Sequence, residues 1–404
     1  MVKVIIVHPS QFTQRWYDYY CIEAIEKCFD VEFWDCSDIT TPSFKTQSPL
    51  KTGHLREVHS LSELLAKVKL QPKDTVLISE IHNNESNKKI HEILSWYFPY
   101  KLHLGFYSNT QNTPLSTSYK VLNSVRNIAA NKFLVPLRTF ITNCKNNQFF
   151  FDRIIYRNDK EYLLKKSLPS IGYKYTFKAD CKKGSFHRIN HPDFETYLNI
   201  KDGDKILSNK FIVYIDDYYP HHPEFIKEFL PEEIQTVATD FYNSMNNYFD
   251  SIEKKYNCPV VVAAHPYANY DSFNPFQNRL VLKFKTAELV RDSFGVLIHG
   301  SNAFSYVVLF QKPVALLYNR AFYKIDYLKT RMEACSYNFH QPLSNTDDIN
   351  NSDNLELHNI DDNFRYSYID NYLGDINNPK SNKILFIEII KEFYNLINVK
   401  LDLK

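Results

Sequence analysis

A short apolar run that ends in a polar dipeptide decides the fold: Pro259-Val260-Val261-Val262-Ala263-Ala264-His265-Pro266. A valine-rich run of this length is typical of a strand that is buried on both faces of a parallel sheet. The pattern recurs in residues 211–215, before Asp216-Asp217, and in residues 296–298, before His299-Gly300-Ser301. Residues 232–256, between the first two runs, have helical periodicity. Strands that alternate with helices predict an α/β domain around a parallel sheet.

The N-terminal part of the chain shows the same alternation. Residues 2–7 and 75–79 predict strands, and residues 15–29 carry apolar positions at helical spacing. A less regular stretch, from about residue 140 to 205, separates the two patterns. We therefore predict two Rossmann-like domains facing a cleft, residues 1–205 and residues 206–404.

Length and composition exclude several classes of protein. The chain has 404 residues, of which 44 % are hydrophobic and 23 % charged, as in ordinary globular proteins. Lys and Arg number 48 against 46 Asp and Glu, so no basic excess points to nucleic acid as a partner. The 8 glycines contain no GxGxxG fingerprint. Gly295 and Gly300 have Walker A spacing, but Ser301 follows where a lysine is needed, which disfavours a P-loop enzyme.

Cysteine usage and hydropathy bear on location. The 7 cysteines are scattered without a CxxC pair, as is typical of reduced thiols in the cytoplasm. No apolar run approaches the ~20 residues of a membrane-spanning helix, and the N-terminal run is too short for a signal peptide. We expect a cytoplasmic protein and leave open a peripheral association with the inner membrane.

Polar residues follow the predicted strands of the C-terminal half. Open parallel sheets bind ligands just beyond the carboxyl ends of their strands. The residues at these points are Asp216, Asp217, His265, His299 and Ser301, and the strand-to-helix junction adds Lys283, Lys285, Thr286 and Glu288. Gly300 allows a close backbone approach and Ser301 suits the N-cap of the next helix, which predicts a phosphate site there. The alternative is a capped helix without a ligand.

His265 and the two aspartates carry the predicted chemistry. A histidine at a strand end can donate to a phosphate or act as a general acid; the alternative is a structural histidine, and His8-Pro9 repeats the dipeptide. Asp216 and Asp217 offer a base, a nucleophile or an acceptor for sugar hydroxyls, unless they form a solvated turn. The nearby histidines at 221 and 222 lack HxxxH or HExxH spacing, so we predict no metal.

The first half offers weaker candidates. Glu80, His82 and Asn83 follow a predicted strand and would face the cleft if they bind a ligand. An exposed loop is the simpler interpretation of these three residues.

Five segments together resemble a known family: Asp216-Asp217, residues 263–266, residues 285–290, residues 299–303 and residues 311–314. They are similar to GT-B-fold bacterial surface-polysaccharide glycosyltransferases, which carry a His-Pro motif and a serine loop before a helix. Bacterial sialyltransferases and Kdo transferases of capsule, O-antigen and lipopolysaccharide synthesis resemble this sequence in the same motifs. The resemblance covers residues 207–320. It departs from the family in Ser301-Asn302, where a second Ser or Thr is usual, and in Tyr218, which replaces the glycine of an acidic motif.

The resemblance implies a nucleotide-sugar donor in the C-terminal domain and a glycan or lipid-linked glycan acceptor in the N-terminal domain, with no separate cofactor. It implies donor contacts from His265, Pro266, Lys283, Thr286, Glu288, His299, Gly300, Ser301 and Asn302. Asp216 or Asp217 would be the base or nucleophile, as in relatives that use CMP-linked acidic sugars of nonulosonate or Kdo type.

Three rival functions stay open. They are a nucleotide-sugar epimerase of the same architecture, a UDP-hexose-dependent transferase, and a non-catalytic nucleotide- or glycan-binding protein.

Overall fold

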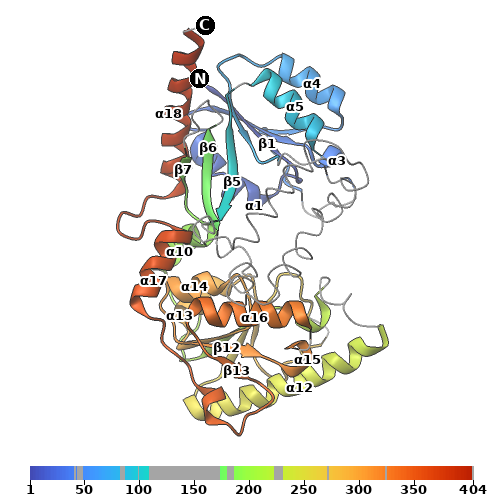
Figure 1. The fold of residues 1–404 in the computed structure, drawn as a ribbon, viewed down its shortest axis with the longest axis vertical. Coiled ribbons are helices and arrows are strands. Elements are labelled where there is room, and N and C mark those ends of the chain that lie inside the picture. Colours follow the sequence, from blue (N-terminus) through green and yellow to red (C-terminus); the bar gives the residue numbers. More distant parts are fainter. Residues whose placement is uncertain are drawn as a thin grey trace, which may run out of the picture. The chain divides into compact units, whose positions relative to one another are not determined.

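The computed structural model describes residues 1–40, 42, 49–81, 87–98, 100–108, 173–179, 186–222, 231–270, 273–323 and 325–402. The described residues form two compact units. The first unit comprises residues 1–108, 173–198 and 370–404, and the second unit contains residues 199–369. Each unit is built on its own largely parallel sheet, which confirms the predicted pair of α/β domains (Figure 1).

The sheet of the first unit has seven strands in the order β3-β2-β1-β4-β5-β6-β7. The strands are β1 (Lys3–His8), β2 (Asp30–Asp35), β3 (Leu55–Glu57), β4 (Val76–Ser79), β5 (Leu102–Ser108), β6 (Tyr173–Ala179) and β7 (Phe186–Arg188). Strands β1 to β5 run parallel, whereas β6 and β7 pair antiparallel. Val4, Ile5, Ile6 and Val7 of β1 are fully buried, as the continuous apolar run predicts.

The helices of the first unit follow the predicted alternation with one exception. They are α1 (Gln14–Tyr19), α2 (Ile22–Ile25), α3 (Ser37–Thr40), α4 (Leu61–Lys69) and α5 (Lys88–Tyr97), with α10 (Pro192–Ile200) at the boundary between the units. The single helix predicted over 15–29 is wrong, because Cys21 adopts a left-handed conformation with φ of 51° and separates α1 from α2. Ser60 caps α4 by accepting the N–H of Glu63.

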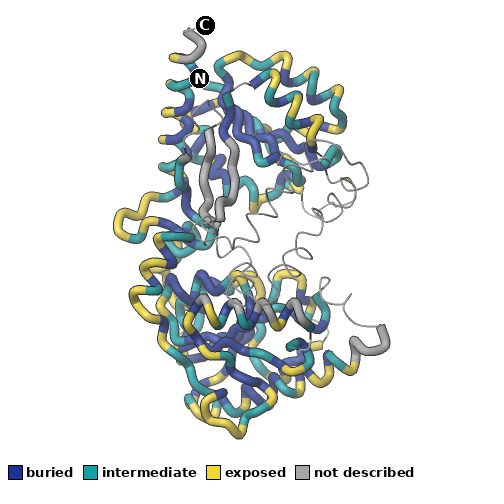
Figure 2. The backbone as a smooth tube through the Cα atoms, viewed as in Figure 1, coloured by how far each residue is buried: buried dark blue, intermediate teal, exposed yellow. Residues whose placement is uncertain are grey.

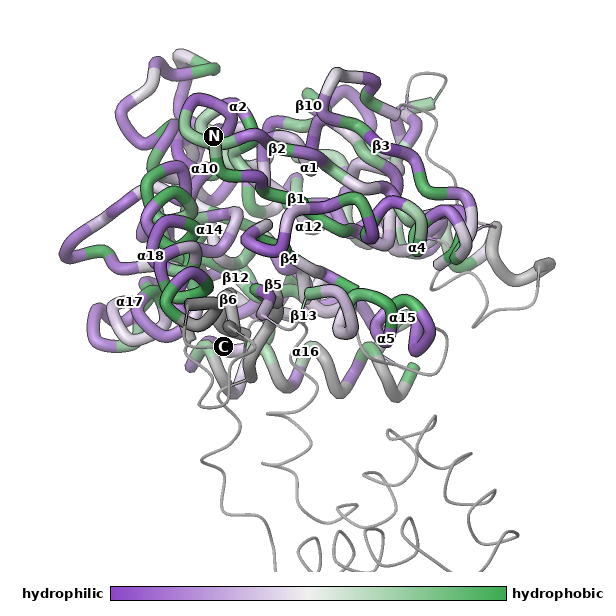
Figure 3. Tube along the Cα trace, turned by 90° about the horizontal axis from the view of Figure 1, so that it is seen from above, coloured by the Kyte–Doolittle hydropathy of each residue, from purple (hydrophilic) through white to green (hydrophobic). Residues whose placement is uncertain are grey.

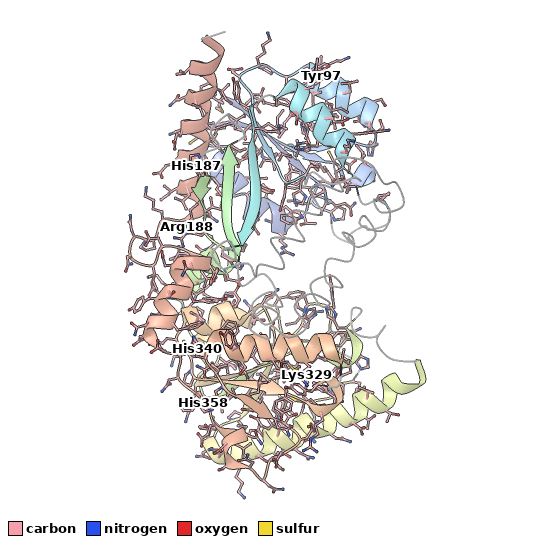
Figure 4. The ribbon with its side chains drawn as sticks, in the orientation of Figure 1. Tyr97, His187, Arg188, Lys329, His340 and His358 are labelled. Carbon is pink, nitrogen blue, oxygen red and sulfur yellow. The ribbon has the colours of Figure 1, made fainter. Side chains whose placement is uncertain are left out.

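The C-terminal helix α18 (Asn382–Asp402) belongs to the first unit, which corrects the predicted domain of residues 206–404. Its apolar face joins the core beneath β1 and β4 through Phe386, Ile390 and Phe393. Figure 1 shows α18 running along the sheet of this unit, and Figure 3 shows the hydrophobic positions along it. Arg188 of β7, labelled in Figure 4, forms an ion pair with Asp370 at 3.2 Å. Burial of an amphipathic face decides where such a helix packs.

The second unit has six parallel strands in the order β10-β9-β8-β11-β12-β13. They are β8 (Ile212–Ile215), β9 (Val260–Ala264), β10 (Val281–Lys283), β11 (Gly295–Ile298), β12 (Val314–Tyr318) and β13 (Leu343–Asn345). Strands β8, β9 and β11 are wholly buried (Figure 2), which confirms the runs that decide the fold. Although residues 343–363 are rich in Asn and Asp, which favours a surface loop, the segment begins with β13, which extends the sheet beside β12.

Helices cover the second sheet. They are α12 (Pro231–Tyr256), α13 (Thr286–Asp292), α14 (Phe304–Leu309), α15 (Arg320–Tyr323), α16 (Asp326–Phe339) and α17 (Asp362–Tyr368), with the short 3₁₀ helices η2 (Tyr219–His221) and η3 (Ser352–Leu355). The π-helix η4 (Ile369–Leu373) begins at the last residue of this unit and continues into the first unit. The predicted apolar face of α12 is confirmed: Phe241, Met245, Phe249 and Ile252 are fully buried in the core with β8 and β9.

Candidate functional site

The sheet of the second unit has a topological switch point between β8 and β11. The chain leaves β8 for β9 and β10 on one side, and the later strands β11, β12 and β13 lie on the other side. In sheets of this order, ligands bind in the crevice beyond the carboxyl ends of the two central strands. The residues that follow Ile215 of β8 and Ile298 of β11 therefore define the candidate site.

The loop after β8, residues 216–222, meets the loops after both neighbouring strands. The ring centroid of Tyr219 lies 5.1 Å from that of His299, which follows β11. On the other side, the ring centroid of His222 lies 5.2 Å from that of His265, which follows β9. Residues that are far apart in sequence therefore meet at one edge of the sheet because the strands are neighbours.

Asp216 is buried and orients two of these loops. Only 2 % of the residue is exposed, and its carboxylate accepts the N–H of Tyr218 and the O–H of Tyr270, both at 2.8 Å. Burial raises the pKa of Asp216 to about 6, although these hydrogen bonds act in the opposite direction. This geometry favours a positioning role for Asp216 over the predicted role as base or nucleophile. Asp217 is partly exposed and remains the candidate base or nucleophile of the two aspartates.

His265 is partly exposed, and its environment fixes where its proton lies. Its Nδ1 accepts the N–H of Tyr267 at 3.2 Å, so Nε2 carries the hydrogen and can donate. Burial lowers the pKa of His265, and the charges of His222 and Lys283 add to this effect. The imidazole is therefore neutral at neutral pH. The exposed Pro266 sits in the turn that Ala268 closes by donating to the carbonyl of His265 at 2.9 Å.

The junction after β10 lies against the same loop. The exposed Lys283 donates from Nζ to the carbonyl of Ala268 at 2.8 Å, which ties β10 to the loop after β9. Phe284 has a φ of 60° and a 72 % exposed residue surface. A backbone conformation of this kind is costly for a bulky residue, and such residues cluster at functional sites.

Thr286 and Glu288 lie on α13, which follows this junction. Thr286 is the first residue of the helix and is partly exposed. The carboxylate of Glu288 is engaged by Lys285, whose Nζ lies 2.9 Å away. Glu288 is therefore held on the surface of the helix by its neighbour three residues before it.

The loop after β11 differs from the prediction at Ser301. Helix α14 begins at Phe304 with Ala303 as its N-cap, so Ser301 does not cap it. Instead, the Ser301 hydroxyl accepts the N–H of Ala303 at 3.4 Å in a turn that precedes the helix. Ser301 is partly exposed and Asn302 is exposed, whereas Gly300 is buried. The predicted coincidence of Ser301 with the helix N-terminus is therefore wrong.

His299 lies in the core of the second unit. Only 2 % of it is exposed, and its ring centroid is 5.8 Å from Tyr214 and 6.0 Å from Phe241. Burial lowers the pKa of His299 to about 3, so the ring is neutral. A side chain enclosed by aromatic rings does not reach a ligand at the edge, and we leave His299 out of the proposed donor site.

A cavity of about 460 Å³ lies beside the loops after β9 and β10. Its lining includes Ala264, Ala268, Tyr270, Asn274 and Lys283, but neither His265 nor Ser301. The cavity therefore extends the candidate site toward β10 rather than toward β11.

Sequence reasoning missed two groups of residues. In the second unit, the partner of Asp216 is Tyr270, which no motif marks. In the first unit, Nε2 of His8 lies 2.7 Å from Oε2 of Glu80, so Glu80 does not lie in a simple exposed loop. The order of the strands would have revealed this pair, because His8 and Glu80 end neighbouring strands. His82 and Asn83 lie outside the described residues.

Comparisons with known proteins give matches among solved structures only. No protein-family model and no curated protein matches the chain. The UDP-GlcNAc 2-epimerase from Methanocaldococcus jannaschii is 11 % identical over 97 % of this chain and 99 % of its own, with a TM-score of 0.39. The wall teichoic acid polymerase TagF is 10 % identical over 99 % and 90 %, with a TM-score of 0.41. The spinosyn forosaminyltransferase SpnP is 12 % identical over 100 % and 99 %, with a TM-score of 0.38. We infer the function from the residues of the chain itself.

None of the described helices combines the length and apolar character that crossing a bilayer requires. Within the same parts of the chain, no three His, Cys, Asp or Glu side chains gather as metal ligands would.

Proposed function

We propose that the protein is a glycosyltransferase that binds a nucleotide sugar at the carboxyl edge of the second sheet. The junction of the loops after β8, β9 and β11 supports this proposal, because the loops meet at one edge of the sheet and His265 has an Nε2 proton to donate there. A neutral imidazole that donates from Nε2 suits the phosphate oxygen that gains charge as the sugar leaves. Donors aimed at developing charge are usually the largest electrostatic contribution to catalysis.

The surrounding residues support an anionic donor. Lys283 lies close enough to lower the pKa of His265 and adds positive charge at the β10 side. Ser301, Asn302 and the backbone of Gly300 form the opposite side of the donor site, and Pro266 and Thr286 border it. We assign Asp217 to the hydroxyls of the donor sugar. In this scheme Lys283 neutralises charge on the leaving group and His265 donates a hydrogen bond to it, so the scheme requires no metal ion.

The preferred donor is a CMP-linked acidic sugar of nonulosonate or Kdo type, and a UDP-hexose is the alternative. The acceptor is a bacterial surface glycan, free or lipid-linked, of capsule, O-antigen or lipopolysaccharide. A lipid-linked acceptor would bring the protein to the inner membrane as a peripheral partner. These assignments rest on the motifs after the strands of the second unit.

A thermal-shift panel with CMP, CDP, UDP and GDP tests the donor site. A nucleotide at 100 times its Kd stabilises the native state by about 2.7 kcal/mol, which is a rise of roughly 5–10 °C in Tm for a domain of this size. We expect one nucleotide to do so, and His265→Ala and Ser301→Ala to reduce the rise.

The matched control is His358→Ala, which changes another partly exposed histidine of the second unit (Figure 4). His358 pairs with Val314 at the amino end of β12, so we expect this variant to keep the full rise. Equal nucleotide affinity in all variants would remove the site assignment. Release of nucleotide that depends on an acceptor separates a transferase from an epimerase, which turns over its sugar alone, and from a binding protein, which releases none.

A further inference from the structure

Two bulky aromatic residues at the carboxyl edge of the second sheet have a left-handed backbone conformation. Tyr218 lies in the loop after β8 with a φ of 56°, and Phe284 follows β10 with a φ of 60°. In this region the Cβ atom crowds the backbone, so glycine adopts the conformation far more readily than tyrosine does. Such residues persist only where their surroundings hold them, and they cluster at functional sites.

Helix ends account for the same conformation elsewhere in this unit. Asn257 directly follows α12, Gln311 follows the C-cap of α14, and His340 is the C-cap of α16. A residue in the left-handed region is a common way for a helix to end. Tyr218 instead follows a strand, so its conformation needs another reason.

One buried carboxylate holds Tyr218 in this conformation. Asp216 is 2 % exposed; its Oδ1 accepts the N–H of Tyr218 and its Oδ2 accepts the O–H of Tyr270, each at 2.8 Å. The ring centroid of Tyr218 lies 5.8 Å from that of Tyr270, with the planes at 75°, and 5.5 Å from that of His221. The backbone and the ring of Tyr218 are therefore both held in place without a ligand.

The ring of Tyr218 borders the proposed donor site. Strand β8 lies between β9 and β11 in the sheet, so the loop of Tyr218 lies between the loops of His265 and Ser301, the two sides of that site. Tyr218 is partly exposed, and its neighbour Tyr270 lines the cavity of about 460 Å³. Burial and the charge of Asp216 raise the pKa of Tyr218, so its ring is uncharged at neutral pH.

We propose that Tyr218 is a specificity-determining residue whose ring stacks on the sugar of the donor, an inference that rests on the proposed function. A tyrosine ring offers an apolar face to the C–H groups of a six-membered sugar ring. A side chain that is already fixed loses little conformational entropy when the sugar binds. The ring also fills space that a glycine would leave open, so it limits which sugars fit above β8.

The test measures dissociation constants by titration calorimetry for wild type, Tyr218→Gly and Tyr218→Phe. The ligands are CMP-N-acetylneuraminic acid, CMP-Kdo, UDP-GlcNAc and UDP-glucose, with CMP and UDP as the bare nucleotides. For the nucleotide sugar that wild type binds, we expect Tyr218→Gly to raise the Kd by about tenfold, the effect of one lost aromatic stack. The Kd of the bare nucleotide should stay the same. Tyr218→Phe keeps the ring and should keep the wild-type Kd for both.

Thermal unfolding separates this role from a purely structural one. Glycine relieves the strain of the left-handed backbone, which offsets the loss of the ring contacts. The Tm of Tyr218→Gly should therefore lie within about 2 °C of wild type, or above it. A Tm that falls by more than about 5 °C with an unchanged Kd for the nucleotide sugar would show that the ring serves the fold and would overturn the inference.

His340→Gly is the matched control. His340 has a φ of 52°, is exposed and precedes β13, so it lies toward the opposite edge of the sheet (Figure 4). This variant should keep every Kd. A nucleotide-sugar Kd for Tyr218→Gly equal to that of wild type overturns the inference and leaves the donor site standing. So does an equal loss of affinity for the bare nucleotide, since the ring would then contact the nucleotide. If wild type binds no nucleotide and no nucleotide sugar, the proposed function fails, and the inference fails with it.

Discussion

The buried carboxyl of Asp216 makes the stability of the second unit depend on pH. Its pKa lies near 6 in the folded protein, against 3.8 for an ordinary aspartate, because burial disfavours its charged form. Between these two values the folded state holds a proton that the unfolded state has lost. The folded state therefore binds more protons, and stability falls as the pH rises from about 4 to about 7. A difference of roughly two pKa units corresponds to about 3 kcal/mol.

Replacing Asp216 by Asn removes this dependence. Asn has a single acceptor oxygen, so either the Tyr218 N–H or the Tyr270 O–H loses its partner, at a cost of about 1–3 kcal/mol at every pH. Relative to wild type, the free energy of unfolding of Asp216→Asn should therefore rise by about 2–2.5 kcal/mol between pH 4 and pH 7. Urea unfolding at several pH values measures this difference. Circular dichroism is the suitable signal, since Trp16, Trp34 and Trp96 all lie in the first unit.

Asp292→Asn is the control for this experiment. Burial of Asp292 opposes its ionisation, but hydrogen bonds from Arg291 and from the N–H of Ile206 prevail and lower its pKa. Its contribution is present above the ordinary aspartate pKa and is lost below it, so Asp292→Asn should show a constant deficit from pH 4.5 to 7.5. If the difference between wild type and Asp216→Asn is equally constant over that range, the raised pKa of Asp216 is refuted.

Two further predictions concern stability. The pKa of His299 is lowered to about 3 by burial, so the unfolded state gains a proton first as the pH falls below 6.5. Between pH 7 and pH 5, the free energy of unfolding of His299→Phe should therefore fall by about 2 kcal/mol less than that of wild type, as measured by urea unfolding. Equal falls in the two proteins would contradict this prediction. A Cβ at Gly374 would lie 2.4 Å from Cδ1 of Phe194, so Gly374→Ala should destabilise the first unit by about 1–3 kcal/mol. Phe194→Leu should relieve part of that loss when tryptophan fluorescence follows unfolding, whereas strictly additive losses would argue against the clash.

Local patterns predicted the strands because burial on both faces leaves a direct mark on the sequence. The run 259–264 became β9 at Val260–Ala264, and the run 211–215 became β8 at Ile212–Ile215. The order of strands leaves no such mark, since it depends on crossovers between distant segments. The packing partner of α18 was hidden for the same reason, because an apolar helix face does not name the surface that it covers.

The candidate site was predictable only where a residue lies directly beyond a strand. Asp216 and His265 both do, and both are at the expected edge. Whether such a side chain turns outward is decided by packing: His299 is enclosed by aromatic rings, although it follows β11 as directly as His265 follows β9. The sequence also does not fix the first residue of a helix. Helix α14 begins at Phe304, later than predicted, so Ser301 lies in a turn before it.

The central strands of the two sheets carry opposite chemistry at equivalent positions. His8 is the last residue of β1, and Asp216 directly follows β8; each is buried and bonded to a neighbouring loop. Glu80 then occupies the position in the first unit that His299 holds in the second. The first edge therefore presents an oriented carboxylate, whereas the second presents the neutral imidazole of His265 and the charge of Lys283. A carboxylate suits the binding of hydroxyl groups, whereas a neutral imidazole beside a lysine suits an anionic group, so the two edges favour different ligands.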